Sequence, residues 1–161
     1  MSESNDPVAA TAPAEVTPNL TLAVLAGLAA AIAGAVIWAV ITVSTKYQIG
    51  FMAIGVGFLV GWTVRSAGKG GAMSFSLIGG ALALFGCLLG NLLSACGFLA
   101  AEQGMPLMTI VVRALSNPSL AVELLRATFN PMDLLFYAIA VYEGFTLARR
   151  PIVRPAAAAA T

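Results

Sequence analysis

Two polar residues interrupt apolar segments of this sequence, and they are the first candidates for chemistry. Glu143 lies within the apolar run 134–148, and Asn91 lies within the run 75–100. An ionisable group inside such a segment is a candidate functional site, because an uncompensated charge in hydrocarbon is costly. Glu143 could bind a proton or a cation, or it could bond to a polar group on another helix, such as Asn91. Asn91 in turn could bond across to a neighbouring helix or line a polar pathway.

Patterns typical of catalytic and metal sites are absent from the sequence. There is no histidine, which is the commonest general base and metal ligand. The motifs G-x-S-x-G, H-E-x-x-H and C-x-x-C do not occur. Asp133 and Glu143 are ten residues apart, so in one helix they would lie at different membrane depths. We expect no catalytic residue, no metal site and no cofactor, and an enzyme is the least favoured class of function.

The composition indicates a membrane protein. Of the 161 residues, 60% are hydrophobic even without glycine, and only 9% are charged. Charged residues make up about 25% of a soluble domain. So few charges could not solvate a globular surface, whereas a lipid bilayer would cover the apolar area. The lipid bilayer is therefore the expected partner, and the net charge of +1 gives no reason to expect nucleic acid.

The apolar residues fall into four segments that could cross a bilayer as helices. At a rise of about 1.5 Å per residue, the first segment would be about 36 Å long and the second about 24 Å, which is short for a bilayer. Trp38 near the end of the first segment, and Tyr47 and Trp62 near the ends of the second, suit anchors at the membrane interface. The expected spans are 20–43, 49–64, 75–100 and 132–148.

The segment 105–130 has a different pattern. Pro106 and Asn117–Pro118 each suit the start of a helix. Polar residues recur at helical spacing, first at positions 109, 113 and 116 and then at positions 119, 123 and 126. This pattern predicts two short amphipathic helices that lie in the membrane interface. A soluble cap packed on the membrane helices would have the same periodicity.

Together these segments predict an all-α fold, an integral membrane four-helix bundle with one or two interfacial amphipathic helices between helices 3 and 4. The membrane domain covers 20–149, after a polar and acidic tail at 1–19 that we expect to be disordered. A C-terminal tail follows at 150–161. The sequence Asn130–Pro131–Met132–Asp133 predicts the start of the fourth helix, because Asn caps a helix, Pro suits its first turn and Asp favours the positive end of its dipole.

Small residues recur at helical spacing within the predicted spans. Gly57 and Gly61 form a G-x-x-x-G pair in the second span, and Gly86 and Gly90 belong to a similar stripe in the third. Stripes of this kind let two membrane helices approach closely. We expect these four glycines to be helix-packing contacts.

The hairpin between the first two spans carries a distinctive pattern. It consists of Gly34–Ala–Val–Ile–Trp38–Ala, then Tyr47–Gln–Ile–Gly50, then Ala53–Ile–Gly–Val–Gly57–Phe–Leu–Val–Gly61. This pattern resembles a module in uncharacterised small bacterial multi-pass membrane proteins. The resemblance covers residues 34–65 well and the third helix loosely. It implies a four-helix protein of the bacterial inner membrane, and it carries no activity and no site residues.

Two classes of function remain open. The first is a structural or interaction module in the bacterial inner membrane, which needs no catalytic residues. The second is a small transporter or channel that uses Glu143 and Asn91, which would have to form an oligomer because four helices enclose no wide pore. Possible partners are a second copy of the chain or another membrane protein.

The distribution of basic residues predicts the orientation of the chain. With four spans, the two tails and the loop 65–73 share one side of the membrane and hold five basic residues, at positions 65, 69, 149, 150 and 154. The opposite side holds Lys46, Arg113 and Arg126. The positive-inside rule then places both termini in the cytoplasm. Reporter fusions at Thr161 and within 105–130 should give opposite locations, and an external C-terminus would contradict the assignment.

Overall fold

The computed structural model describes residues 17–150, and all regular structure within that range is helical. The predicted tails at 1–19 and 150–161 lie almost wholly outside the described residues. Asn19 is an exception, because it caps the first helix by accepting a hydrogen bond from the backbone N–H of Leu22 at 2.9 Å. The helices are α1 (Leu20–Thr45), α2 (Phe51–Gly68), α3 (Met73–Gln103), α4 (Leu107–Ser116), α5 (Pro118–Thr128) and α6 (Pro131–Arg149).

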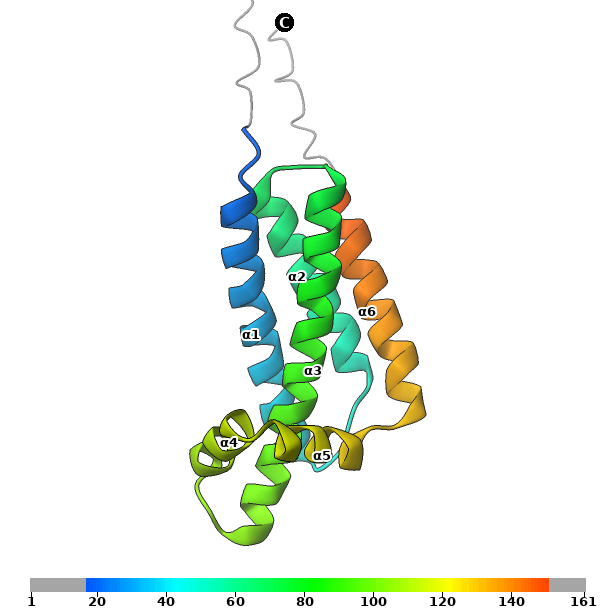
Figure 1. Cartoon of the computed structure of the whole chain (residues 1–161). Coiled ribbons are helices and arrows are strands. Elements are labelled where there is room, and N and C mark those ends of the chain that lie inside the picture. The colour runs from blue at the N-terminus through cyan, green and yellow to red at the C-terminus, as the bar shows by residue number, and fades with distance from the viewer. Residues whose placement is uncertain (1–16, 151–161) are drawn as a thin grey trace, which may run out of the picture.

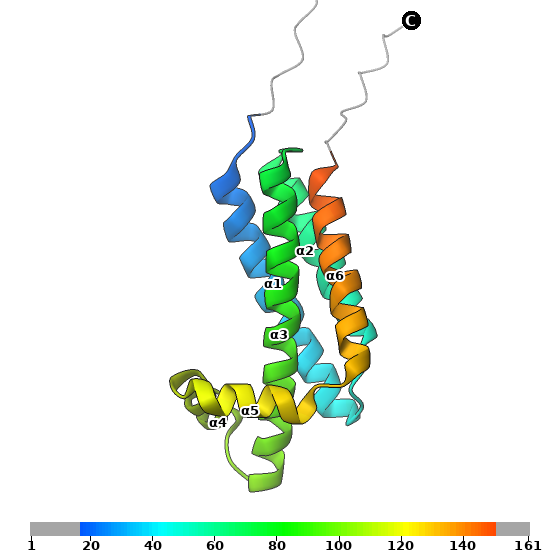
Figure 2. The same cartoon turned by 45° about the vertical axis from the view of Figure 1, so that its right-hand side comes forward.

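Helices α1, α2, α3 and α6 lie side by side as a four-helix bundle (Figures 1 and 2), which confirms the predicted fold class. Of these, α1, α2 and α3 are long and apolar enough to cross a membrane. Helix α6 has 19 residues, carries Asp133, Glu143 and Arg149, and is not among the helices that meet that standard. It nevertheless packs along α2 and α3. Helices α4 and α5 would form a further span only as one unit bent by 114°.

The helix lengths differ from the expected spans in two informative ways. Helix α2 continues four residues past the predicted end at 64, so Arg65 belongs to the helix and the following loop is shorter than predicted. Its 18 residues span about 27 Å. Helix α3 has 31 residues and spans about 46 Å. Figure 1 shows its C-terminal turns projecting beyond the other three helices of the bundle.

Helices α4 and α5 form a belt across the projecting end of α3 (Figures 1 and 2). Ile110 and Ala114 of α4 are buried against Cys96 and Ala100 of α3. Helix α5 has no buried residue and contacts only α3 and α4 among the helices. The belt is therefore an appendage of α3 and contributes little to the core of the bundle.

The predicted starts of α4, α5 and α6 are confirmed, and an Asn side chain caps two of these helices. Asn130 accepts a hydrogen bond from the backbone N–H of Met132 at 3.0 Å, and Asp133 accepts one from the backbone N–H of Asn130 at 2.9 Å. This reciprocal capping box satisfies two backbone donors at the start of α6. Asn117 caps α5 with Pro118 in its first turn, and Pro106 directly precedes α4.

The described chain begins and ends at the same end of the bundle (Figure 1), and the loop between α2 and α3 lies there as well. This is the arrangement that four alternating spans require. The loop between α1 and α2 and the α4–α5 belt lie at the opposite end. Which end faces the cytoplasm stays a prediction from the basic residues.

Backbones meet directly where α6 packs on its neighbours. A Cβ atom built on Gly57 would lie 2.7 Å from the Cα of Ala140, and one built on Gly61 would lie 2.9 Å from the Cβ of Leu147. A Cβ atom on Gly144 would lie 2.7 Å from the backbone oxygen of Gly79, and one on Gly79 would collide with the backbone oxygen of Gly144. The approach of α6 to α2 and α3 therefore requires residues without side chains.

Two further glycines make room for side chains of α1 and α2. A Cβ atom on Gly86 would lie 2.7 Å from a methyl group of Val56 and 3.3 Å from the Cβ of Ala31. One on Gly90 would lie 2.9 Å from the indole ring of Trp38. Both positions lie where α3 faces its neighbours.

Substitution of two glycines on one helix should separate packing from helix propensity. Gly57→Ala should destabilise the bundle by about 1–3 kcal/mol, because the added methyl group meets backbone that cannot rotate away. Gly55→Ala is the matched control, because no atom lies within 4 Å of its built Cβ. Alanine favours helix there by up to about 1 kcal/mol. Unfolding in detergent measures both variants, and equal melting temperatures would contradict this account of the α2–α6 contact.

Candidate functional site

Asn91 is buried in α3, with only 1% of its surface exposed. Its Oδ1 atom accepts a hydrogen bond from Nε2 of Gln48 at 3.1 Å, and the same Nε2 donates to the backbone oxygen of Thr128 at 3.1 Å. Gln48 lies exposed in the loop between α1 and α2, and Thr128 is the last residue of α5. One glutamine side chain thus joins the interior of α3 to a loop and to the end of the belt.

Trp38 lies in the core against Gly90 of α3 and does not anchor the protein at the membrane interface. Only 1% of its surface is exposed, and its ring packs edge-on against Tyr137 of α6 with ring centroids 6.5 Å apart. The prediction for Trp38 was wrong because α3 has Gly90 where the indole ring needs space. Tyr47 and Trp62, in contrast, are 74% and 54% exposed, as anchors at an interface would be.

Four buried residues form what we term the polar cluster, namely Trp38, Thr42, Asn91 and Tyr137. Thr42 is one helical turn beyond Trp38 on the same face of α1. The Asn91 side chain is the hydrogen-bonding neighbour of the Tyr137 hydroxyl group. Even so, the Trp38 Nε1, Thr42 Oγ1, Asn91 Nδ2 and Tyr137 hydroxyl atoms are buried without a hydrogen bond of acceptable geometry.

Asp133 gives the polar cluster a negative neighbour. It is the one charged side chain that is buried among residues 17–150, with 5% exposed. Its carboxylate accepts the hydrogen bond from the backbone N–H of Asn130, and it lies one turn before Tyr137, close enough to act electrostatically on the hydroxyl group. The capping contact holds this charge at the positive end of the α6 dipole.

Glu143 does not belong to the polar cluster. It is half-buried on α6, next to the close contact at Gly144. Within residues 17–150 its carboxylate makes no hydrogen bond or ion pair, and Asn91 bonds instead to Gln48. The structure therefore keeps the two predicted site residues apart, and Asn91 is not the partner of Glu143 that one of the alternatives had suggested. Glu143 lies six residues beyond Tyr137, about 9 Å along the helix axis.

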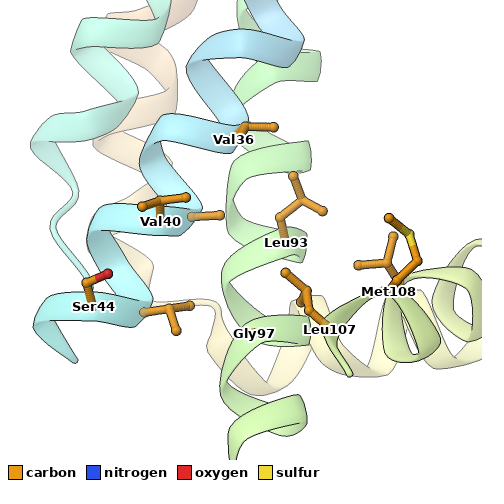
Figure 3. A pocket seen from close by; sticks show the side chains of 10 residues that line it. Val36, Val40, Ser44, Leu93, Gly97, Leu107 and Met108 are labelled. Atoms are coloured by element: carbon orange, nitrogen blue, oxygen red, sulfur yellow. The ribbon is translucent and has the colours of Figure 1, made fainter. Parts of the chain in front are cut away.

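A separate apolar groove lies outside the bundle where α1, α3 and α4 meet (Figure 3). Its volume is about 590 Å³. Val40 of α1, Leu93 of α3 and Met108 of α4 line it, and Ser44 is the one polar side chain in its lining. The groove suits apolar ligands, and its outer side is the surface that lipid would cover.

The cluster and its surroundings can bind through hydrogen bonds, but they are not arranged as a general acid–base pair. Within the described residues, no group of three or more His, Cys, Asp or Glu side chains converges as metal ligands would. Cys87 and Cys96 are both free and buried, in different hydrophobic clusters. The donors of the polar cluster come from an indole, an amide and two hydroxyl groups.

Sequence reasoning named Asn91 but missed Gln48, Thr42 and Tyr137. Thr42 and Tyr137 are ordinary residues of apolar helices, and only their depth distinguishes them. Gln48 lies in the short loop between the first two predicted spans. A long polar side chain in so short a loop can reach the ends of the neighbouring helices, and this signal could have identified it. Gly144 was also missed, although Ala140, Gly144 and Ala148 recur at four-residue intervals like other small-residue stripes.

Removing the glutamine should loosen the belt and the cluster together. Gln48→Ala leaves Oδ1 of Asn91 and the Thr128 carbonyl without a donor, so we expect a loss of about 1 kcal/mol in unfolding free energy. We also expect faster amide hydrogen exchange in α5. The matched control is Gln103→Ala, an exposed glutamine at the end of α3. Equal exchange in the two variants would mean that Gln48 does not hold the belt.

Comparison with other proteins adds no assignment. No protein family, no curated protein and no solved structure matches the chain. The likeness of its first hairpin to small bacterial membrane proteins therefore stays an expectation from the residues. What the site can do has to be argued from its own geometry.

Proposed function

We propose that the chain is a structural or interaction module of the bacterial inner membrane. The observation that carries this proposal is the packing of the bundle interior between its two ends. Ala31, Val56, Val60 and Ala83 are 0–3% exposed there, and Gly86 brings α3 against Val56 and Ala31. A transport path through a single copy would need polar groups at this level, and small apolar side chains fill it instead. The packing therefore favours a rigid scaffold.

The belt supplies the part of the module that a partner could use. Leu107, Met108, Val112 and Leu115 of α4 are each at least half exposed, although α4 also buries Ile110. Such a helix offers apolar side chains to the bilayer interface and to any membrane protein beside it. We infer that the bundle anchors the belt at a fixed depth. The positive-inside rule would place the belt on the outer side of the inner membrane.

The alternative is a small oligomeric transporter or channel that uses Glu143 and Asn91. Its support is that Glu143 is half-buried without a partner inside residues 17–150, so that a neighbouring copy could complete a site around it. Asn91 gives less support, because it faces the interior of one copy and bonds to Gln48. The alternative therefore depends on Glu143 alone.

A flux assay distinguishes the two functions. Purified protein reconstituted into liposomes should give proton, potassium and sodium fluxes no greater than those of empty liposomes, because the interior of the bundle is closed. Glu143→Gln and Glu143→Leu should then fold and melt like the parent protein within about 1 kcal/mol, since the carboxylate bonds to nothing in the described chain. A flux that the parent protein supports and Glu143→Gln abolishes would establish the transporter instead.

A further inference from the structure

The polar cluster leaves four buried atoms without a hydrogen bond of acceptable geometry, although the Asn91 amide and the Tyr137 hydroxyl group are neighbours. Each unmet donor or acceptor costs about 1–3 kcal/mol when it is buried, and most buried polar groups in native structures are bonded to protein or ordered water. Trp38, Thr42 and Asn91 are at most 1% exposed, and Tyr137 is 5% exposed. Tyr137 of α6 contacts the Trp38 ring of α1 and neighbours the Asn91 side chain of α3, and Thr42 lies one turn from Trp38 on the same face of α1. One small ligand could therefore reach several of them.

The chemistry of the four groups restricts that ligand. The indole of Trp38 and the amide nitrogen of Asn91 can only donate, whereas the two hydroxyl groups can donate or accept. A metal cation would meet mainly donors, so it is disfavoured. An anion would meet the negative field of Asp133, which lies one turn from Tyr137 on the same helix. A small neutral molecule that accepts and donates fits the set best.

We propose that the polar cluster is a buried water-binding site, in which water bridges Trp38, Thr42, Asn91 and Tyr137. Buried waters in proteins typically make about three hydrogen bonds to groups that would otherwise be unsatisfied. The polar groups of the cluster belong to three different helices and could supply about that number of hydrogen bonds to a bound water. This site is separate from the proposed scaffold function. It would hold bound water inside a bundle that is otherwise apolar.

Gln48 closes the site off from the aqueous phase. Its side chain is exposed, yet its Nε2 atom bonds to Asn91 inside the bundle. A surface pocket of about 590 Å³ lies beside it, lined in part by Tyr47, Phe51 and Phe136. We therefore expect water to exchange with the site from the end of the bundle that carries the belt, when Gln48 moves away from Asn91. The apolar section around Ala31 and Val56 separates the site from the other end.

Nuclear magnetic resonance of the Trp38 indole proton tests the proposal in the full-length protein. The sequence has two tryptophans, and Trp62→Phe, at an exposed position, leaves only the Trp38 signal. We expect a cross-peak between this proton and water in nanodiscs. Thr42→Val and Tyr137→Phe should each weaken it, because each removes one hydroxyl group with little change of shape. Thr42→Ser should restore it.

The matched control is Thr63→Val, which removes a hydroxyl group that is already bonded to the Leu59 carbonyl at 2.7 Å. It should leave the water signal of Trp38 unchanged. No water signal in the parent protein would overturn the proposal and mean that the four groups bond to one another in a dry core. A signal that survives both Thr42→Val and Tyr137→Phe would overturn the assignment of the ligands.

The exchange rate of the same proton tests the role of Gln48. Gln48→Ala should speed its exchange with solvent, whereas Gln103→Ala should not. Amide exchange around Ala31 should stay at the parent rate, which would distinguish local opening from a general loss of stability. An unchanged rate for the Trp38 proton in Gln48→Ala would overturn the closing role of Gln48.

Discussion

Direct contact between helix backbones is the constraint on which the rest of this structure depends. In a bilayer the hydrophobic effect does not drive helices together, because lipid tails are as apolar as the helices, so association relies on close packing and on hydrogen bonds. The reciprocal contact of Gly79 with Gly144, and that of Gly57 with Ala140, brings α6 against α3 and α2. These contacts offset the weak apolar character of α6, which lacks the composition of an independent span. Helix α6 is therefore held in the bundle by how closely it packs.

The two halves of the bundle use different means of association. Around Ala31, Val56 and Gly86 the interior consists of small apolar groups in contact. Toward the belt the helices carry larger and polar side chains, and Gly90 provides the space that Trp38 fills against Tyr137. One side-chain hydrogen bond also joins the elements in that half, where Gln48 reaches Asn91 from the loop. The position of the polar groups near the aqueous end limits the cost of burying them, because water can reach that end.

The sequence was sufficient to predict the helices, because length, apolar runs and capping residues are local properties. It predicted the all-α bundle, the two short helices of the belt and the Asn130 cap at the start of the fourth helix. The apolar pattern of α1 does not show which face points inward, because α1 is apolar on every side. A stripe of small residues at helical spacing does show it, because every member of the stripe is buried, namely Ala23, Gly27, Ala30, Ala31 and Gly34. Trp38 lies on this buried face, and it was assigned to the interface because it is a tryptophan near the end of the predicted span. Asn91 was recognised by its polarity, but its partner Gln48 is 43 positions away and only the tertiary fold brings the two together. Glu143 drew attention because it is charged, and charge alone does not show whether a carboxylate has a partner.

Gln48 links two features that otherwise have little in common. Helix α5 buries no residue of its own, so its place beside the bundle depends on α3, α4 and the bond from Gln48 to the Thr128 carbonyl. The same nitrogen atom is the donor for Asn91 in the interior. If α5 moved away and drew Gln48 with it, Asn91 would lose a hydrogen bond at a buried position, where an unsatisfied group is costly. The hydrogen bond between Gln48 and Asn91 inside the bundle therefore contributes to the free energy that holds the exposed belt in place. An amphipathic helix pair with no core of its own can in this way keep a defined position at the end of a helical bundle.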